Sequence, residues 1–88
     1  MASEEELDLL FNALSHRARK AVVRALGEEK ELIFTDMMRI AGIDETGTFG
    51  FHLKRLAPLL ERTETGKYKL SELGKLGYLL LRFAEEGD

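Results

Sequence analysis

The clearest hydrophobic pattern in the chain lies between residues 46 and 70. Apolar residues recur there at i, i+4, i+7 and i+11, one face of a helix over 46–61: Phe49, Leu53, Leu56 and Leu60. The following residues alternate as strands do on either side of a short turn at Thr65-Gly66. The pattern therefore predicts an amphipathic helix that leads directly into a two-stranded hairpin.

Two more helices are expected before residue 30. The first begins at Ser3, whose hydroxyl can cap the helix while Glu6 reaches back, and its apolar stripe is Leu7, Leu10, Phe11 and Leu14. The second begins at Ser15 and ends at Gly27. Its apolar face has the spacing of a helix packed on a core: Ala18, Ala21, Val22, Ala25 and Leu26.

A short strand and two further helices complete the chain. The apolar run 32–34 predicts a brief strand, and Thr35 is a good cap for a helix that carries Met37, Met38, Ile40 and Ala41. Gly42 ends that helix, Asp44 caps the helix over 46–61, and a last helix begins at Ser71.

These elements predict a mainly α fold with a small β-hairpin, in the order helix, helix, strand, helix, helix, strand, strand, helix. Two consecutive helices joined by the connection 42–45 form a helix-turn-helix, and the hairpin over 62–69 forms a wing. The expected fold class is therefore a winged helix-turn-helix. With 88 residues, the chain has room for one such domain over 1–88.

Charge is distributed unevenly along the chain. The net charge of −3 does not by itself favour nucleic acid, because affinity for phosphates comes chiefly from Lys and Arg. Residues 1–14 hold four acidic groups and no basic one, whereas residues 15–70 hold eleven basic and eight acidic groups, a net of +3. The positive field is therefore expected on the face that the central elements form.

Composition argues against several classes of protein. Cysteine is absent, and His16 and His52 lie on different predicted helices without metal-binding spacing, so neither a metal nor another cofactor is expected. No catalytic constellation is present, so an enzyme is not expected. No apolar run approaches the roughly 20 residues that span a bilayer, and the start MASEEELD is acidic where a signal peptide would be basic. We expect a soluble, cytoplasmic protein.

Several segments resemble one family of DNA-binding proteins. They are ALSHRARKAVVRAL at 13–26, GFHLKRL at 50–56, and a Gly-Lys-Tyr wing that leads into LSELG at 70–74. Together they resemble the ArsR-like winged helix-turn-helix transcriptional regulators, and most closely the small metal-free versions found in archaea. The resemblance implies a homodimer that binds double-stranded DNA and acts as a repressor.

The chain departs from that family at three points. Where the family's second helix usually opens with Asp or Asn, Pro, Thr and Arg, only Arg19 matches, and the resemblance implies a structural role for it. Gly50 stands where the family has a serine. The cysteines that would bind a regulatory metal are missing, so metal sensing is not carried over.

The helix over 46–61 is the element expected to enter the major groove. Its face away from the predicted core carries hydrogen-bonding, small, aromatic and cationic residues: Thr46, Gly47, Thr48, Phe51, Lys54 and Arg55. The alternative is an ordinary solvated helix surface, on which glycines are unusual because each costs about 1 kcal/mol in a helix. Asp44 and Glu45 bring negative charge to the helix start and are expected to weaken non-specific binding.

Phosphate contacts are expected from two other places. In the hairpin, Arg62, Lys67 and Lys69 are candidates, although the hairpin can instead serve only to cover the core edge. At the start of the second helix, the resemblance implies His16 and Arg17 as phosphate neighbours. The cations Lys20 and Arg24 farther along that helix are expected to pair with the acidic first helix, and His52 to be packed or phosphate-bonded.

The last helix carries more apolar surface than one small core can cover. Together with the first helix it is expected to form a two-fold homodimer interface, through Leu7, Leu10, Phe11, Leu76, Leu79, Leu80 and Phe83. Gly74 and Gly77 are expected to let helices cross closely.

The expected function is sequence-specific binding of double-stranded DNA to regulate transcription, with residues 15–70 as the DNA-binding core. The competing interpretation is a winged-helix module for protein–protein interaction, in which Phe51 and the acidic ends dock onto another protein and DNA is never bound.

Overall fold

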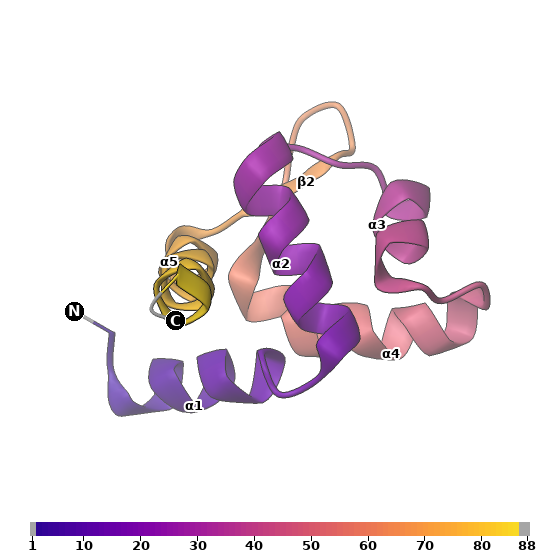
Figure 1. Cartoon of the computed structure of the whole chain (residues 1–88). Coiled ribbons are helices and arrows are strands. Elements are labelled where there is room, and N and C mark those ends of the chain that lie inside the picture. Colours follow the sequence, from indigo (N-terminus) through magenta and orange to yellow (C-terminus); the bar gives the residue numbers. More distant parts are fainter. Residues whose placement is uncertain (1, 87–88) are drawn as a thin grey trace.

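The computed structural model describes residues 2–86. Within them the chain is mostly helical with one small antiparallel hairpin, as the sequence predicts (Figure 1). The elements are α1 (Glu4–Ala13), α2 (Arg17–Glu29), α3 (Phe34–Ala41), α4 (Thr46–Leu56), the 3₁₀ turn η1 (Ala57–Leu59), β1 (Leu60–Arg62), β2 (Tyr68–Leu70) and α5 (Glu72–Glu86).

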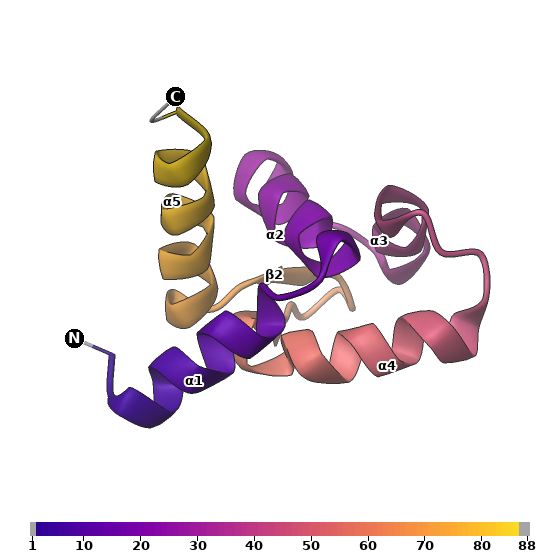
Figure 2. The same ribbon diagram turned by 60° about the horizontal axis from the view of Figure 1, so that its bottom comes forward.

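Helix α2 occupies the middle of the molecule, with α3 on one side and α5 on the other (Figures 1 and 2). Helices α1 and α4 lie along a common side, below α2 in both views. The core between these elements consists of Leu10, Ala13, Val22, Val23, Leu26, Met37, Phe49, Leu56, Leu59 and Leu70. The fold therefore separates α5 from α3 and from the start of α4.

The predicted capping box at the start of α1 is confirmed. The amide of Glu6 donates to Ser3 Oγ at 3.1 Å, and the amide of Ser3 donates to Glu6 Oε1 at 2.9 Å. The start of α2 differs from the prediction, because His16 and not Ser15 caps it, by accepting from the Ala18 amide at 3.0 Å. Ser15 instead donates to the Asn12 carbonyl at 2.7 Å and closes α1.

The predicted end of α2 at Gly27 is wrong, because the helix continues to Glu29. A Cβ at Gly27 would lie 2.2 Å from Cδ1 of Tyr78, so this glycine lets the tyrosine ring of α5 pack directly on the α2 backbone. Glycine here serves packing between helices and does not mark a helix end. The helix ends at Lys30, which has φ +77°.

The predicted strand over 32–34 does not form. Leu32 makes only a single antiparallel bridge with Tyr68. Helix α3 begins at Phe34, and its N-cap is Ile33 and not the predicted Thr35. The earlier start turns the Phe34 ring edge-on to Phe49, with ring centroids 5.2 Å apart. This contact joins the start of α3 to the buried Phe49 of α4. Gly42 ends α3 in the left-handed conformation, as predicted.

Helix α4 is shorter than the predicted helix over 46–61 and begins with a different cap. It ends at Leu56 because Pro58 lacks a backbone N–H and its ring clashes with the preceding helical turn. The chain then passes through η1 into β1, which carries Leu60. At the other end, the Glu45 side chain and not that of Asp44 accepts from the Thr48 amide.

The hairpin connects α4 to α5. Leu60 pairs with Leu70 and Arg62 with Tyr68, and Gly66 in the connecting turn has φ +82°. The hairpin therefore begins about two residues earlier than the predicted hairpin over 62–69. The predicted cap of α5 is confirmed, since the Gly74 amide donates to Ser71 Oγ at 3.1 Å.

Within residues 2–86, no helix combines the length and apolar character required to cross a membrane.

Candidate nucleic-acid interface

Helix α4 presents one continuous exposed stripe. Gly47, Phe51 and Lys54 lie along its middle, because residues three and four apart share a helical face. The Phe51 side chain is 53% exposed, and the Arg55 guanidinium lies over its ring at 5.1 Å from the centroid. All six residues that the sequence predicts for the groove are thus exposed on α4, and Gly47, Phe51, Lys54 and Arg55 among them lie along one line.

The two glycines of α4 have no packing role inside the chain. A Cβ at Gly50 would meet nothing within 4 Å, and one at Gly47 would meet only Glu45 Oε1, at 3.8 Å. By contrast, a Cβ at Gly74 would lie 2.1 Å from the Leu59 carbonyl oxygen. Internal packing therefore accounts for Gly74 and for Gly27, whereas it leaves the glycines of α4 without an internal reason.

The start of α4 is rich in hydrogen-bond acceptors. The Glu45 carboxylate accepts from the Thr48 amide at 3.2 Å and also from the Thr48 hydroxyl. Because the Thr48 hydroxyl proton is used in this way, its oxygen is left to accept hydrogen bonds from another molecule. Thr46 lies exposed at the first position of the helix.

A shallow groove of about 390 Å³ separates α4 from the hairpin. Its apolar floor is bordered by Lys54 on α4 and Arg62 on β1. The Arg62 guanidinium lies over the Tyr68 ring at 4.5 Å from the centroid and donates to the Tyr68 hydroxyl at 3.0 Å, which holds this cation beside the groove.

The two lysines of the hairpin differ in position. Lys67 is exposed in the turn. Lys69 belongs to β2, where it lies 3.8 Å from the Glu61 carboxylate and faces the opposite side of the hairpin, toward α5. Only Lys67 is therefore free to contact a ligand seated on α4 and the groove.

The start of α2 lies beside the other edge of α4. The His16 ring lies against the ring of His52 on α4, with centroids 4.4 Å apart, and His52 meets Phe51 edge-on at 5.6 Å. Arg17, the first residue of α2, is exposed. The predicted backbone contacts at the start of α2 and in the hairpin thus flank α4 on its two sides.

A buried arginine fixes this corner of the fold. Arg19 donates to the Ala13 carbonyl at 2.9 Å, to the Asn12 carbonyl at 3.2 Å, to Ser15 Oγ at 3.2 Å and to His52 Nδ1 at 2.7 Å. It thereby closes the end of α1 and ties it to α4, which confirms the structural role inferred for Arg19. His52 is packed against Arg19, one of the two alternatives for this histidine.

The bond from Arg19 determines the state of His52. Arginine can only donate, so Nδ1 of His52 must accept, and the neutral ring carries its proton on Nε2. Burial lowers the pKa of His52, and the positive charges of His16 and Arg19 lower it further. Burial likewise lowers the pKa of Arg19, with a smaller contribution from Arg55. The corner therefore favours a neutral His52.

This cluster predicts a loss of stability in acid. Since the pKa of His52 in the folded chain is lowered, the unfolded chain takes up a proton first as the pH falls through about 6.5, and stability declines from there until the folded pKa is passed. The melting temperature is therefore expected to fall between pH 7.5 and pH 5.

The matched variant for this prediction is His52→Asn, whose side-chain oxygen can still accept from Arg19 but does not titrate. Its melting temperature should fall less over the same pH interval than that of the wild type. An equal fall in both proteins would show that groups other than His52 govern the acid response.

Several cations, the candidate DNA contacts among them, have no acidic partner within residues 2–86. Five ion pairs join described residues: Arg24–Glu85, Arg39–Asp36, Lys69–Glu61, Lys75–Glu72 and Arg82–Glu86. None of them involves Arg17, Lys54, Arg55, Arg62 or Lys67. The expectation that Lys20 and Arg24 pair with the first helix is wrong, because the partner of Arg24 lies on α5 and Lys20 forms none of these five pairs.

A comparison with known families matches residues 8–77 to the family described as Domain of unknown function (DUF7347). The chain belongs to this family. None of the curated proteins and none of the solved structures compared matches it. The DUF7347 match covers α2, α3, α4, the hairpin and the beginning of α5, and so includes all of the surface described above.

The exposed apolar residues of this DUF7347 protein lie mainly on α1 and α5. Phe83, beyond the matched region, is 80% exposed, and Phe11, Leu79 and Leu80 are also exposed. Leu7 and Leu76 are half-buried against the core of the same chain. Leu10 differs from its predicted place at an interface, because packing on the core leaves it fully buried.

Proposed function

We propose that this DUF7347 protein is an ArsR-like winged helix-turn-helix transcriptional regulator that binds double-stranded DNA as a homodimer in the cytoplasm and acts as a repressor. In this proposal α3, the connection to α4 and α4 form the helix-turn-helix, and the β1–β2 hairpin is the wing. One observation carries it: the exposed stripe of α4 is flanked on both sides by cations that have no acidic partner among residues 2–86.

The chemistry of the stripe fits the floor of a major groove. Lys54 and Arg55 can donate to the acceptors of guanine, and Phe51 can lie against a thymine methyl group. The acceptors at Glu45 and Thr48 suit the amino groups of cytosine or adenine. The bare backbone at Gly47 and Gly50 permits close approach, which supplies the missing reason for two glycines in a helix.

The flanking cations suit the phosphate backbone. Arg62 is held beside the groove by Tyr68, and Lys67 extends from the turn, so the hairpin can reach one strand. His16 and Arg17 on the far side of α4 can reach the other. Such contacts fix the position of α4 without reading sequence, because phosphates are the same at every base pair.

The exposed residues of α1 and α5 supply the dimer surface: Phe11, Leu79, Leu80 and Phe83. In Figures 1 and 2 α5 lies across the molecule from the start of α4, so a two-fold dimer through α5 leaves both α4 stripes open. Half-sites one turn of DNA apart require the two α4 helices to stand about 34 Å apart.

A protein-binding module is the second candidate function, and the exposure of Phe51 favours it. An aromatic ring at the centre of an exposed helix is a common anchor in protein interfaces. The acidic pair Asp44 and Glu45 beside it repels phosphate. The two candidates differ in their dependence on salt.

The deciding experiment selects duplexes from genomic fragments and measures affinity as a function of salt concentration. Three phosphate-binding cations in each subunit, Arg17, Arg62 and Lys67, give a log-log slope of about −5 for a dimer. Lys67→Ala should weaken binding to all duplexes alike and make the slope shallower by about 2, one contact per subunit.

Lys69→Ala is the matched control, since Lys69 lies two residues away in the same hairpin but is paired with Glu61 and lines the pocket toward α5. Its slope should equal that of the wild type. Equal losses in both variants would refute the assignment of Lys67, and a protein that retains no genomic duplex at low salt would refute DNA binding itself.

A further inference from the structure

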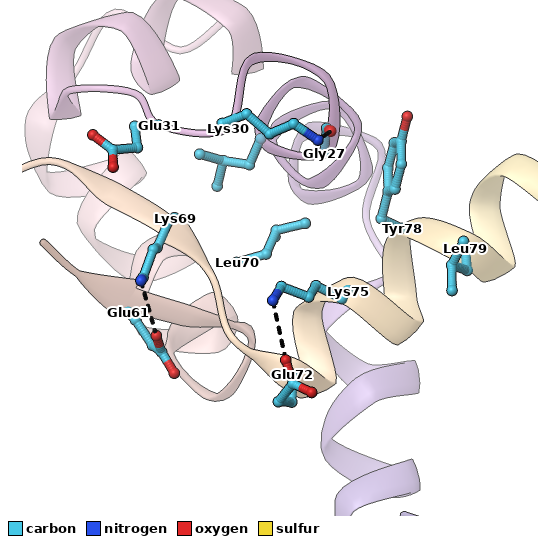
Figure 3. A pocket seen from close by; sticks show the side chains of 11 residues that line it. Gly27, Lys30, Glu31, Glu61, Lys69, Leu70, Glu72, Lys75, Tyr78 and Leu79 are labelled. Atoms are coloured by element: carbon cyan, nitrogen blue, oxygen red, sulfur yellow. Dashed lines mark hydrogen bonds and ion pairs between the residues drawn. The ribbon is translucent and has the colours of Figure 1, made fainter.

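A second pocket lies on the opposite side of the hairpin from α4. Its volume is about 410 Å³, and its walls come from the end of α2, from β1 and β2, and from the first half of α5 (Figure 3). The apolar part of the lining consists of Leu26, Leu70, Tyr78 and Leu79. In Figure 3 Leu70 points into the space between the hairpin and α5, with Tyr78 and Leu79 beyond it.

The charged residues at the rim are not equivalent. Glu72 is 91% exposed, so its pair with Lys75 is an easily exchanged surface contact. Glu61 is occupied by Lys69. Glu31 points away from the other lining residues in Figure 3. Lys30 has no carboxylate within ion-pair distance in residues 2–86. The ammonium group of Lys30 therefore has no carboxylate partner among residues 2–86, and that of Lys75 meets only the exposed carboxylate of Glu72, which an anion can replace.

Lys30 also has an uncommon backbone conformation. It is the only non-glycine residue among 2–86 with a positive φ, at φ +77° and ψ −48°. Glycine would adopt this conformation without cost, whereas a residue with a Cβ is strained there. Its only side-chain bond within the described chain is a long one of 3.5 Å to the Gly27 carbonyl. Helix capping of this kind does not require a lysine, and glycine would end the helix with less strain.

We propose that this pocket binds a small amphiphilic carboxylate with an aliphatic body. The aliphatic body lies on Leu26, Leu70 and Leu79, and the carboxylate accepts hydrogen bonds from Lys30 and Lys75. The pocket volume of about 410 Å³ admits an aliphatic chain, and burial of that chain against the apolar lining is favourable. Binding itself is independent of the DNA-binding proposal.

Three probes with the same apolar chain test the charge requirement: decanoate, 1-decanol and decyltrimethylammonium, each kept monomeric and titrated into the full chain by calorimetry and amide chemical shifts. Decanoate should bind at least about tenfold more tightly than the neutral or cationic probe, the factor that corresponds to one charge-assisted hydrogen bond. The amides of Gly27 and Leu70 should respond most strongly.

Two variants test the two lysines. Lys75→Met and Lys30→Gly should each weaken decanoate binding about tenfold. Lys30→Gly should at the same time raise the melting temperature, because it removes the strained Cβ, so weaker binding by that variant cannot be attributed to unfolding. Lys20→Met, which alters a lysine outside the pocket, should bind decanoate as the wild type does.

Three results would overturn the proposal. They are equal binding of all three probes, chemical-shift changes confined to the exposed end of α5 around Phe83, and unchanged decanoate affinity in Lys30→Gly and Lys75→Met. The first would indicate simple adsorption to apolar surface, and the second would place the amphiphile on the proposed dimer surface.

Discussion

Replacing Gly74 with alanine is expected to destabilise the protein by about 3 kcal/mol or more. The added Cβ would lie 2.1 Å from the carbonyl oxygen of Leu59 and 3.0 Å from Cδ2 of Leu70. The first of these neighbours is backbone, in the turn that Pro58 imposes, so it cannot move aside as a flexible side chain would. Insertion of this kind costs about 3 kcal/mol or more in a packed core.

A loss of that size is large for this chain. Small domains have a total stability of about 5–10 kcal/mol, and each kcal/mol corresponds to about 4–8 °C in melting temperature. The melting temperature of Gly74→Ala, followed by circular dichroism, should therefore fall by more than about 12 °C.

Gly50→Ala is the control for this prediction, because it makes the same chemical change in a helix where the new Cβ meets nothing within 4 Å. Alanine is favoured over glycine in a helix by about 1 kcal/mol, so this variant should melt higher than the wild type. Equal effects at Gly74 and Gly50 would mean that helix propensity alone governs both positions and that the contact between α5 and η1 is looser than it is in the structure.

The sequence predicts best where the determining contacts are local. The capping box of α1, the glycine that ends α3 and the cap of α5 each depend on residues three or four positions apart, and all three are confirmed. The apolar stripes of the helices also depend on local spacing, and most of their members lie in the core.

The errors arise where a distant contact overrides a local signal. Gly27 has the composition of a helix end, yet it lies within α2 because Tyr78, far along the chain, packs on it. The run over 32–34 has strand composition, yet Phe34 is the first residue of α3 and meets the distant Phe49 edge-on. The error in the length of α4 is different, because Pro58 is a local signal that indicates the end of the helix.

In the candidate site, too, the sequence predicts what depends on local spacing and misses what depends on distant contacts. The spacing of α4 is enough to place Phe51, Lys54 and Arg55 on one exposed face. It does not reveal that Arg19 reaches His52, a residue 33 positions away, or that Glu45 engages the Thr48 hydroxyl. The position of α4 relative to α1 and α2 depends on that arginine, and no pattern of residue types along the chain predicts its hydrogen bonds.

Substitutions at two exposed phenylalanines can test separately the roles proposed for α5 and α4. Phe83 on α5 is 80% exposed and Phe51 on α4 is 53% exposed. Replacing either one with aspartate places a negative charge on the surface of that helix. Neither side chain belongs to the core, so both variants should fold and melt close to the wild type.

Both variants should lose affinity for DNA, but they should differ in oligomeric state. Phe83→Asp should be monomeric by light scattering, because an aspartate at a two-fold interface faces its own copy or apolar surface. Its affinity for a two-half-site duplex should fall by about 100-fold or more, since the second half-site no longer adds to binding by the first. Phe51→Asp should remain dimeric and should lose binding to every duplex, because its carboxylate stands where the bases and phosphates approach α4.

The combination of results is more informative than either variant alone. If Phe51→Asp abolishes DNA binding and leaves the dimer intact, α4 is the reading surface and α5 the interface. If Phe51→Asp instead disrupts the dimer, then the stripe of α4 is covered by a second copy of the chain and cannot at the same time enter a groove, which contradicts the proposed function. If both variants bind duplexes as the wild type does, the unpaired cations around α4 serve another ligand, and the winged-helix assignment then describes the shape of the molecule without its function.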